Sequence, residues 1–150
     1  MKVTTLTVDC GGTGIKASVL DKGGKVLIDF PYLKTPYPLS PSKLISIIDD
    51  FVKADNRIKR VTLGLPGMIR GGKVIVIPHY VNASGPRGVV DSHLKKAWYG
   101  FDMQTMLKKK IKLPTLVLND AEVHASAVIT GKGLETVLTF GTGLGSAIFS

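Results

Sequence analysis

The chain has 150 residues, of which 44% are hydrophobic and 21% are charged, so we expect a folded domain with a buried core rather than a disordered chain. No targeting peptide is recognisable, no apolar run approaches the roughly 18 residues of a membrane-spanning helix, and the single cysteine, Cys10, excludes an internal disulfide, so we expect a cytoplasmic protein with no membrane partner. Twenty Lys and Arg against eleven Asp and Glu give a net charge of +9, which attracts polyanions such as nucleic acid, nucleotides or polyphosphate.

The start of the chain predicts three strands. Apolar and polar residues alternate over residues 3–9 and 15–21, and a third run, 25–30, follows Gly23 and Gly24. Because glycine-rich turns separate these runs, we expect an antiparallel β meander.

A proline-rich loop and a helix are predicted next. The loop covers residues 31–41, and its last two residues, Ser40 and Pro41, are typical of a helix start. Apolar residues then recur with helical spacing up to about Ala54, which predicts an amphipathic helix. Its apolar face consists of Leu44, Ile45, Ile47, Ile48, Phe51 and Val52.

The middle of the chain is less regular. Residues 60–65 predict a strand that ends at Pro66 and Gly67, and residues 68–77 predict a hairpin around a pair of glycines. We predict no regular element over residues 78–98.

The last third of the chain alternates helices and strands. We predict a helix over 102–110, a strand over 115–118, a helix over 121–130 and two strands, 136–140 and 147–149, joined by a glycine-rich turn. The first of these helices presents the apolar residues Met103, Met106 and Leu107. A meander followed by alternating helices and strands predicts a mixed sheet covered by helices, which is an α/β domain.

The stretch DCGGTGIK, residues 9–16, combines glycines with charged residues. Glycines let main-chain N–H groups approach a ligand closely, and neighbouring N–H groups form a concave anion site. We therefore predict that this loop binds phosphate, that Lys16 meets a terminal phosphate, and that Asp9 binds Mg²⁺ directly or through water. The alternative is a plain glycine-rich hairpin with ordinary surface charges. A second glycine-rich stretch, FGTGLGS at 140–146, is a candidate phosphate-binding loop for the same reason. Its alternative is a bulged hairpin turn between two strands.

Two further motifs follow predicted strands. In LNDAE, residues 118–122, Asp120 could accept a proton from a substrate hydroxyl as its oxygen attacks phosphorus, while Asn119 orients the alcohol. The alternative is a plain helix cap. In GLPG, residues 64–67, the bare backbone of Gly67 could line a sugar ring, or the motif is only a turn.

Four stretches, DCGGTGIKASVLD, LGLPGMI, LVLNDAEVHA and VLTFGTGLGSAIF, carry a family resemblance when taken together. In this order and spacing they resemble the N-terminal portion of ROK-type sugar kinases, in the actin-like ATPase superfamily, and most closely the polyphosphate glucokinases among them. The resemblance implies a ribonuclease H-like lobe over residues 1–133. It also implies that residues 134–150 are the first strand, turn and strand of a truncated second lobe.

The resemblance also implies roles for individual residues. Asp120 matches the catalytic base, and Asp9 matches the aspartate that works with Mg²⁺. Asn119, Gly67 and Asp120 match the sugar-binding face, and Asn82 is a further candidate there. The implied phosphate-binding positions are Gly11, Gly12, Thr13, Lys16, Gly141, Thr142, Gly143 and Gly145.

The implied activity is transfer of a phosphoryl group from ATP or polyphosphate to the 6-hydroxyl of a hexose, with glucose expected and Mg²⁺ as cofactor. A non-catalytic, sugar-sensing member of the same family is the alternative. No stacking aromatics or recognition motif support a specific nucleic-acid partner. The lysine runs 95–96 and 108–112 are either solvated faces or guides for polyphosphate. The sequence leaves open whether the chain forms a homodimer.

Overall fold

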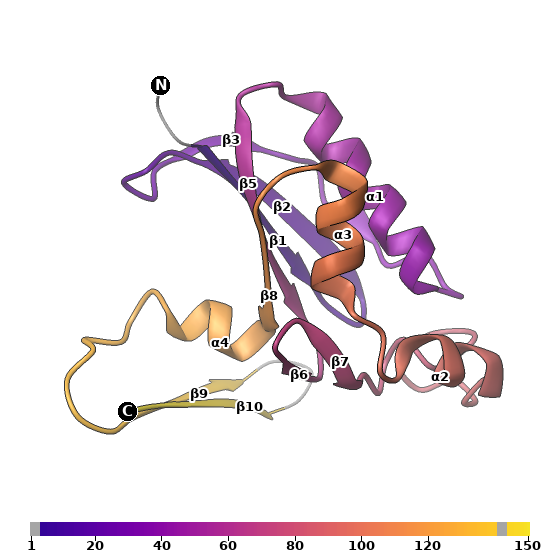
Figure 1. The fold of residues 1–150 in the computed structure, drawn as a ribbon. Coiled ribbons are helices and arrows are strands. Elements are labelled where there is room, and N and C mark those ends of the chain that lie inside the picture. Colours follow the sequence, from indigo (N-terminus) through magenta and orange to yellow (C-terminus); the bar gives the residue numbers. More distant parts are fainter. Residues whose placement is uncertain (1–3, 141–143) are drawn as a thin grey trace.

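The computed structural model describes residues 4–140 and 144–150 and shows a mixed α/β fold (Figure 1). The strands are β1 (Thr4–Cys10), β2 (Gly14–Leu20), β3 (Val26–Asp29), β4 (Leu33–Lys34), β5 (Ile58–Leu65), β6 (Met68–Arg70), β7 (Lys73–Val76), β8 (Thr115–Asn119), β9 (Glu135–Phe140) and β10 (Leu144–Phe149). The helices are α1 (Pro41–Ala54), α2 (Ser92–Trp98), α3 (Met103–Ile111) and α4 (Asp120–Ala125). Over the described residues, none of these helices is long and apolar enough to cross a membrane.

The main sheet has six strands. Five follow the order β3-β2-β1-β5-β8, and β4 pairs with β2 beside this path. β1, β2 and β3 pair antiparallel, which confirms the predicted meander. The short strand β4 was not predicted, because the prolines around it indicate a loop, but the backbone of Lys34 still pairs with Gly14 of β2.

The other half of the sheet is parallel, which confirms the predicted mixed sheet. β5 pairs parallel with both β1 and β8. In this register Asp9 lies beside Gly64, and Leu65 lies beside Asn119. The motifs that follow these three strands therefore meet at one edge of the sheet, as expected for the carboxyl ends of parallel strands.

α1 and α3 lie side by side and cover one face of this sheet (Figure 1). α1 begins as predicted, because Ser40 is its N-cap and Oγ of Ser40 accepts a hydrogen bond from Lys43 N. The two helices are joined by the buried Asp49, whose carboxylate lies 2.7 Å from Lys53 Nζ and 3.4 Å from Lys110 Nζ. The core beneath them consists of aliphatic side chains of β1, β2 and β5, including Leu6, Val8, Ile15, Val61 and Leu63.

Met106 does not belong to the buried face of α3, contrary to the prediction. The buried residues of this helix are Met103, Leu107 and Ile111, which recur every four residues and therefore share one face. Met106 lies outside that stripe and is 44% exposed.

α2 lies in the segment where no regular element was predicted. Asp91 is its N-cap and accepts hydrogen bonds from His93 N and Leu94 N. Only Leu94 and Trp98 attach this short helix to the core, which is too sparse a pattern to predict a helix from periodicity. Trp98 is fully buried, and its Nε1 donates to Leu39 O at 2.8 Å.

α4 is shorter than the predicted helix over residues 121–130. Ser126 Oγ donates back to Val123 O at 2.6 Å, and the N–H groups of Thr130 and Gly131 donate to the carboxylate of Glu135. These last two N–H groups are therefore not available for helical hydrogen bonds.

Two hairpins lie outside the main sheet. β6 and β7 form the predicted hairpin after β5. β9 and β10 form a second antiparallel pair, in which Phe140 lies opposite Leu144. This second hairpin packs on α4 through a small cluster of Ala121, Ala125 and Ala147.

Candidate active site

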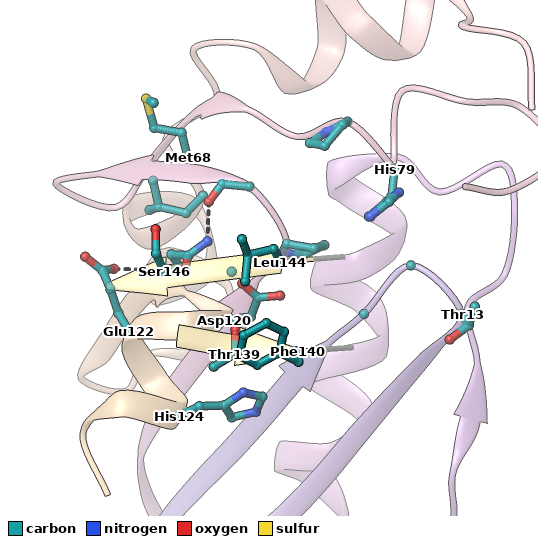
Figure 2. Close-up of a pocket in the computed structure, with 18 of the residues that line it drawn as sticks. Thr13, Met68, His79, Asp120, Glu122, His124, Thr139, Phe140, Leu144 and Ser146 are labelled. Carbon is teal, nitrogen blue, oxygen red and sulfur yellow. Dashed lines mark hydrogen bonds between the residues drawn. The ribbon is translucent and has the colours of Figure 1, made fainter. Parts of the chain in front are cut away.

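A cleft of about 700 Å³ opens at the carboxyl edge of the main sheet. Its walls come from the loop after β1, the turn after β5, the start of α4 and the β9–β10 hairpin. Figure 2 shows Asp120 in this cleft, with His79 and His124 on different sides of it. Together with Pro78 and His79, the cleft thus brings together five segments of the sequence.

Side-chain hydroxyl groups fix the loop after β1, residues 11–13, by hydrogen bonds. All three of its carbonyl oxygens accept side-chain hydrogen bonds, so the orientation of each peptide unit is fixed before any ligand arrives. These bonds are Thr35 Oγ1 to Gly11 O at 2.9 Å, Tyr80 Oη to Gly11 O at 3.1 Å, Tyr37 Oη to Gly12 O at 2.7 Å and Tyr32 Oη to Thr13 O at 3.1 Å.

Two glycines of this motif are packed closely against neighbouring side chains. A Cβ on Gly12 would lie 3.1 Å from the ring of His79 and 3.1 Å from Pro86, and a Cβ on Gly14 would collide with the ring of Tyr32. Gly11, Gly12 and Thr13 all line the cleft. The hairpin interpretation and the anion-site interpretation of this motif are therefore compatible, because the turn itself faces the cleft.

Asp9 is the last residue but one of β1, next to this loop, and is not itself among the residues that line the cleft. Its side chain is 34% exposed, and Oδ2 lies 3.5 Å from His124 Nε2 on α4. Lys16 is exposed and lies opposite Asp9 in the β1–β2 pair, but it is not among the residues that line the cleft.

Asn119 is the N-cap of α4, as the alternative reading of this motif predicted. Its Oδ1 accepts from Ala121 N at 2.8 Å, and Asn119 N donates to Glu122 Oε2 at 2.9 Å, which completes a capping box. Its Nδ2 donates to Gly67 O at 2.5 Å and so joins α4 to the turn after β5. Asn119 and Gly67 both line the cleft.

Asp120 is the first residue of α4, and it is half-buried in the cleft. Burial raises the pKa of its carboxyl above the ordinary value, and the negative charge of Asp9 raises it further. The Ala121 N–H, which donates to Asp120 Oδ1 at 2.9 Å, and the nearby His124 oppose this rise. A carboxylate with a raised pKa is a better proton acceptor, which suits a general base.

Comparison with protein families matches residues 5–150 of the chain to the ROK family. The chain belongs to the ROK family. The polyphosphate glucokinase of Mycobacterium tuberculosis (strain H37Ra) is 27% identical over 149 residues, which cover 94% of this ROK chain and 51% of that protein. The N-acetylmannosamine kinase of Escherichia coli (strain SE11) is 29% identical over 154 residues, which cover 99% of this chain and 48% of that protein.

Solved structures agree with this family assignment. The inorganic polyphosphate/ATP-glucomannokinase of Arthrobacter sp. strain KM matches with a TM-score of 0.70 and 28% identity, over 97% of this ROK chain and 58% of that one. This match confirms the fold predicted from the resemblance, an N-terminal lobe of the actin-like ATPase type. The ROK chain spans about half the length of the curated relatives that it matches.

Of the remaining residues that were predicted to bind ligands, some line the cleft and others do not. Gly145 lines the cleft, whereas Gly141, Thr142 and Gly143 lie outside the described residues. Asn82 is not among the residues that line the cleft. It is 5% exposed, and its Nδ2 donates to Pro86 O at 3.2 Å.

Four ionisable residues that line the cleft of the ROK chain were not predicted to lie at the site: Arg70, His79, Glu122 and His124. For two of them, the spacing in the sequence could have indicated the position. Glu122 follows Asn119 by three residues, which is the spacing of a capping box, and His124 follows Asp120 by four residues, which places both on one face of a helix. His79 had no such signal, because it lies in an irregular segment.

The raised pKa of Asp120 makes a prediction for stability. The folded state of the ROK chain binds the Asp120 proton more tightly than the unfolded state, so stability falls as pH rises from the ordinary pKa of an aspartate through the raised one. We expect Asp120→Asn, which keeps the hydrogen bond from Ala121 N but carries no charge, to raise the Tm at neutral pH by about 1–2 °C. Thermal unfolding at several pH values measures this. The gain should disappear below about pH 4, and a lower Tm at neutral pH would contradict the prediction.

Proposed function

We propose that this ROK chain acts in phosphoryl transfer from ATP or polyphosphate to the 6-hydroxyl of a hexose, with glucose as the expected acceptor. The observation that carries this proposal is the position of Asp120, half-buried with a raised pKa in the same cleft as the first glycine loop. A proton acceptor and a phosphate-binding loop in one cleft are the two parts that this reaction needs most.

In the proposed reaction, Asp120 accepts the proton of the sugar hydroxyl as its oxygen attacks the terminal phosphorus of the donor. Main-chain N–H groups of Gly12 and Thr13 hold the phosphates, in a loop whose carbonyls are already fixed by tyrosine hydroxyls. One N–H of the Asn119 side chain bonds Gly67 O, and its Oδ1 accepts one bond in the helix cap. Asn119 binds the sugar through the remaining N–H and the remaining lone pair of Oδ1. Such preorganisation lowers the cost of arranging the reactants.

The residues at this site fit a magnesium ion. Asp9 is partly exposed at the end of β1, and its negative charge raises the pKa of Asp120, so a divalent cation would relieve the repulsion between two nearby carboxylates. Among the described residues, no three His, Cys, Asp or Glu side chains cluster to hold a metal by themselves. Asp9, water and donor phosphates would therefore hold Mg²⁺, which supplies neutralisation of charge on the phosphates.

We also propose that residues 1–133 form one lobe and that residues 134–150 begin a second. The support for this boundary is that β9 and β10 form a sheet of their own rather than extending the main sheet.

Product formation tests the proposed function. The protein is incubated with Mg²⁺, with ATP or polyphosphate, and with glucose, mannose or N-acetylmannosamine, and sugar phosphate is measured. We expect glucose 6-phosphate with at least one donor. Sugar binding in calorimetry without any product would contradict the proposal and favour the sugar-sensing alternative, and binding of neither sugar nor donor would contradict both.

A further inference from the structure

A second cavity, of about 500 Å³, borders the glycine loop of the proposed active site. It is lined by Thr13 and by residues 84–88, and Thr13 also lines the first cleft. The two cavities therefore meet at the tip of the β1–β2 turn. Neither the sequence motifs nor the family comparison assigns a role to this second cavity.

Residues 83–89, which we call the SGPRG loop, have a closed and internally bonded conformation. Ala83 N donates to Val89 O at 3.3 Å, and Gly88 N donates to Gly85 O at 2.9 Å. The amide of Asn82 closes the base of the loop through its bond to Pro86 O. Asn82 therefore has a structural role in shaping the SGPRG loop.

The SGPRG loop packs directly on the glycine loop. Pro86 lies 3.1 Å from the position that a Cβ on Gly12 would occupy. The ring of Tyr37 lies 3.9 Å from the corresponding position on Gly85, and the hydroxyl of the same tyrosine bonds Gly12 O. Tyr37 thus contacts both loops and holds the wall of the second cavity in a defined position relative to the glycine loop.

The charge of the second cavity differs from that of the first. Arg87 is exposed and is the one charged residue among the described residues that line the second cavity, whereas the first cleft is lined by the carboxylates of Asp120 and Glu122 as well as by the basic residues Arg70, His79 and His124. Within the described residues, no carboxylate lines the second cavity. A guanidinium group with hydroxyls of Thr13 and Ser84 nearby suits phosphate oxygens, which it can bind in a bidentate manner, better than it suits an uncharged sugar.

The geometry points to a second phosphate subsite, in which Arg87 and the SGPRG loop bind phosphate units of an inorganic polyphosphate chain beyond those held in the cleft. This inference rests on the proposed function, since it requires a donor whose end lies at the glycine loop. Thr13 joins the two cavities, so one chain of repeating phosphates could contact both. Tripolyphosphate and the triphosphate of ATP have only three phosphate units each, so a subsite beyond the cleft would favour a longer donor.

Binding measurements with Arg87→Gln and Arg87→Lys test this subsite. We expect Arg87→Gln to raise the Kd for long-chain polyphosphate by about 3- to 10-fold, because a charge-assisted contact at an exposed site is lost. The Kd for tripolyphosphate and for ATP should change by less than about 2-fold, and Arg87→Lys should restore part of the affinity. The slope of log K for polyphosphate against the logarithm of salt concentration should also become less steep, by about one unit, because one cationic contact is lost.

Arg60→Gln is the matched control, because Arg60 is exposed on β5, donates to Thr5 Oγ1 and lines neither cavity. An equal loss with this control, or an equal loss for ATP and polyphosphate, would overturn the subsite. Unchanged polyphosphate binding in Arg87→Gln together with normal sugar phosphate formation would reject the subsite and leave the proposed function intact. Arg87-dependent polyphosphate binding without any product would support the subsite and reject the proposed transfer.

Discussion

We expect the replacement of Asp120 by Asn to lower the rate of the proposed phosphoryl transfer by about 10²- to 10⁴-fold, which is the usual contribution of a positioned general base. The amide occupies the same volume and its oxygen still accepts from Ala121 N, so the start of α4 is preserved. What is lost is the ability to accept the proton of the attacking hydroxyl. The rate at saturating sugar and donor measures this effect, and the KM values should change far less.

Asp50→Asn is the matched control for this substitution, since Asp50 is exposed on α1 and does not line the cleft. This control should keep the full rate. A rate that survives Asp120→Asn would show that another group accepts the proton, or that none is needed. The pH profile adds a second check, because the wild-type rate should fall in acid with a midpoint above the ordinary pKa of an aspartate.

Replacing Trp98 by Ala will lower the free energy of unfolding by about 3–5 kcal/mol, which is a large part of the stability of a typical domain. Trp98 is fully buried, its ring lies 5.4 Å from that of Tyr80 and 6.5 Å from that of Phe101, and its indole N–H is bonded to Leu39 O. The substitution leaves a cavity and an unpaired carbonyl.

Denaturant unfolding of Trp98→Ala measures this loss. Tyr99→Ala is the neighbouring control, because Tyr99 is 36% exposed, and its removal should cost less than about 1 kcal/mol. Equal losses for the two variants would contradict the role assigned to the buried indole. Because Tyr80 also bonds Gly11 O, Trp98→Ala should in addition weaken donor binding through the glycine loop.

The elements that could be predicted from the sequence are those with strong local signals. Alternation defined β1 and β2, and the Ser40-Pro41 start with its apolar face defined α1, because such patterns follow directly from strand and helix geometry. α2 has too few apolar residues for its periodicity to be visible. The predicted helix after Asp120 was too long: α4 ends at Ala125, and the N–H groups of Thr130 and Gly131 bond the carboxylate of Glu135, which lies in the next strand.

The residues of the candidate site also fall into those that the sequence predicts and those that it does not. Asp9, Asp120 and the glycines of the first loop were predicted, because their types and their places at strand ends carry chemical information. The tyrosines that hold this loop were not predicted. Tyr32, Tyr37 and Tyr80 lie 19, 25 and 69 residues from the carbonyls that they bond, so only the folded chain brings these groups together.

The small alanine cluster beneath the β9–β10 hairpin has a mechanical consequence. Gly145 of this hairpin lies so close to α4 that a Cβ on it would be 3.2 Å from the Cβ of Ala121, the residue that directly follows Asp120. Side chains this small provide no flexible layer between the two segments. A side chain larger than hydrogen at position 145 would therefore press on Ala121, and so on the start of α4 next to the carboxylate of Asp120.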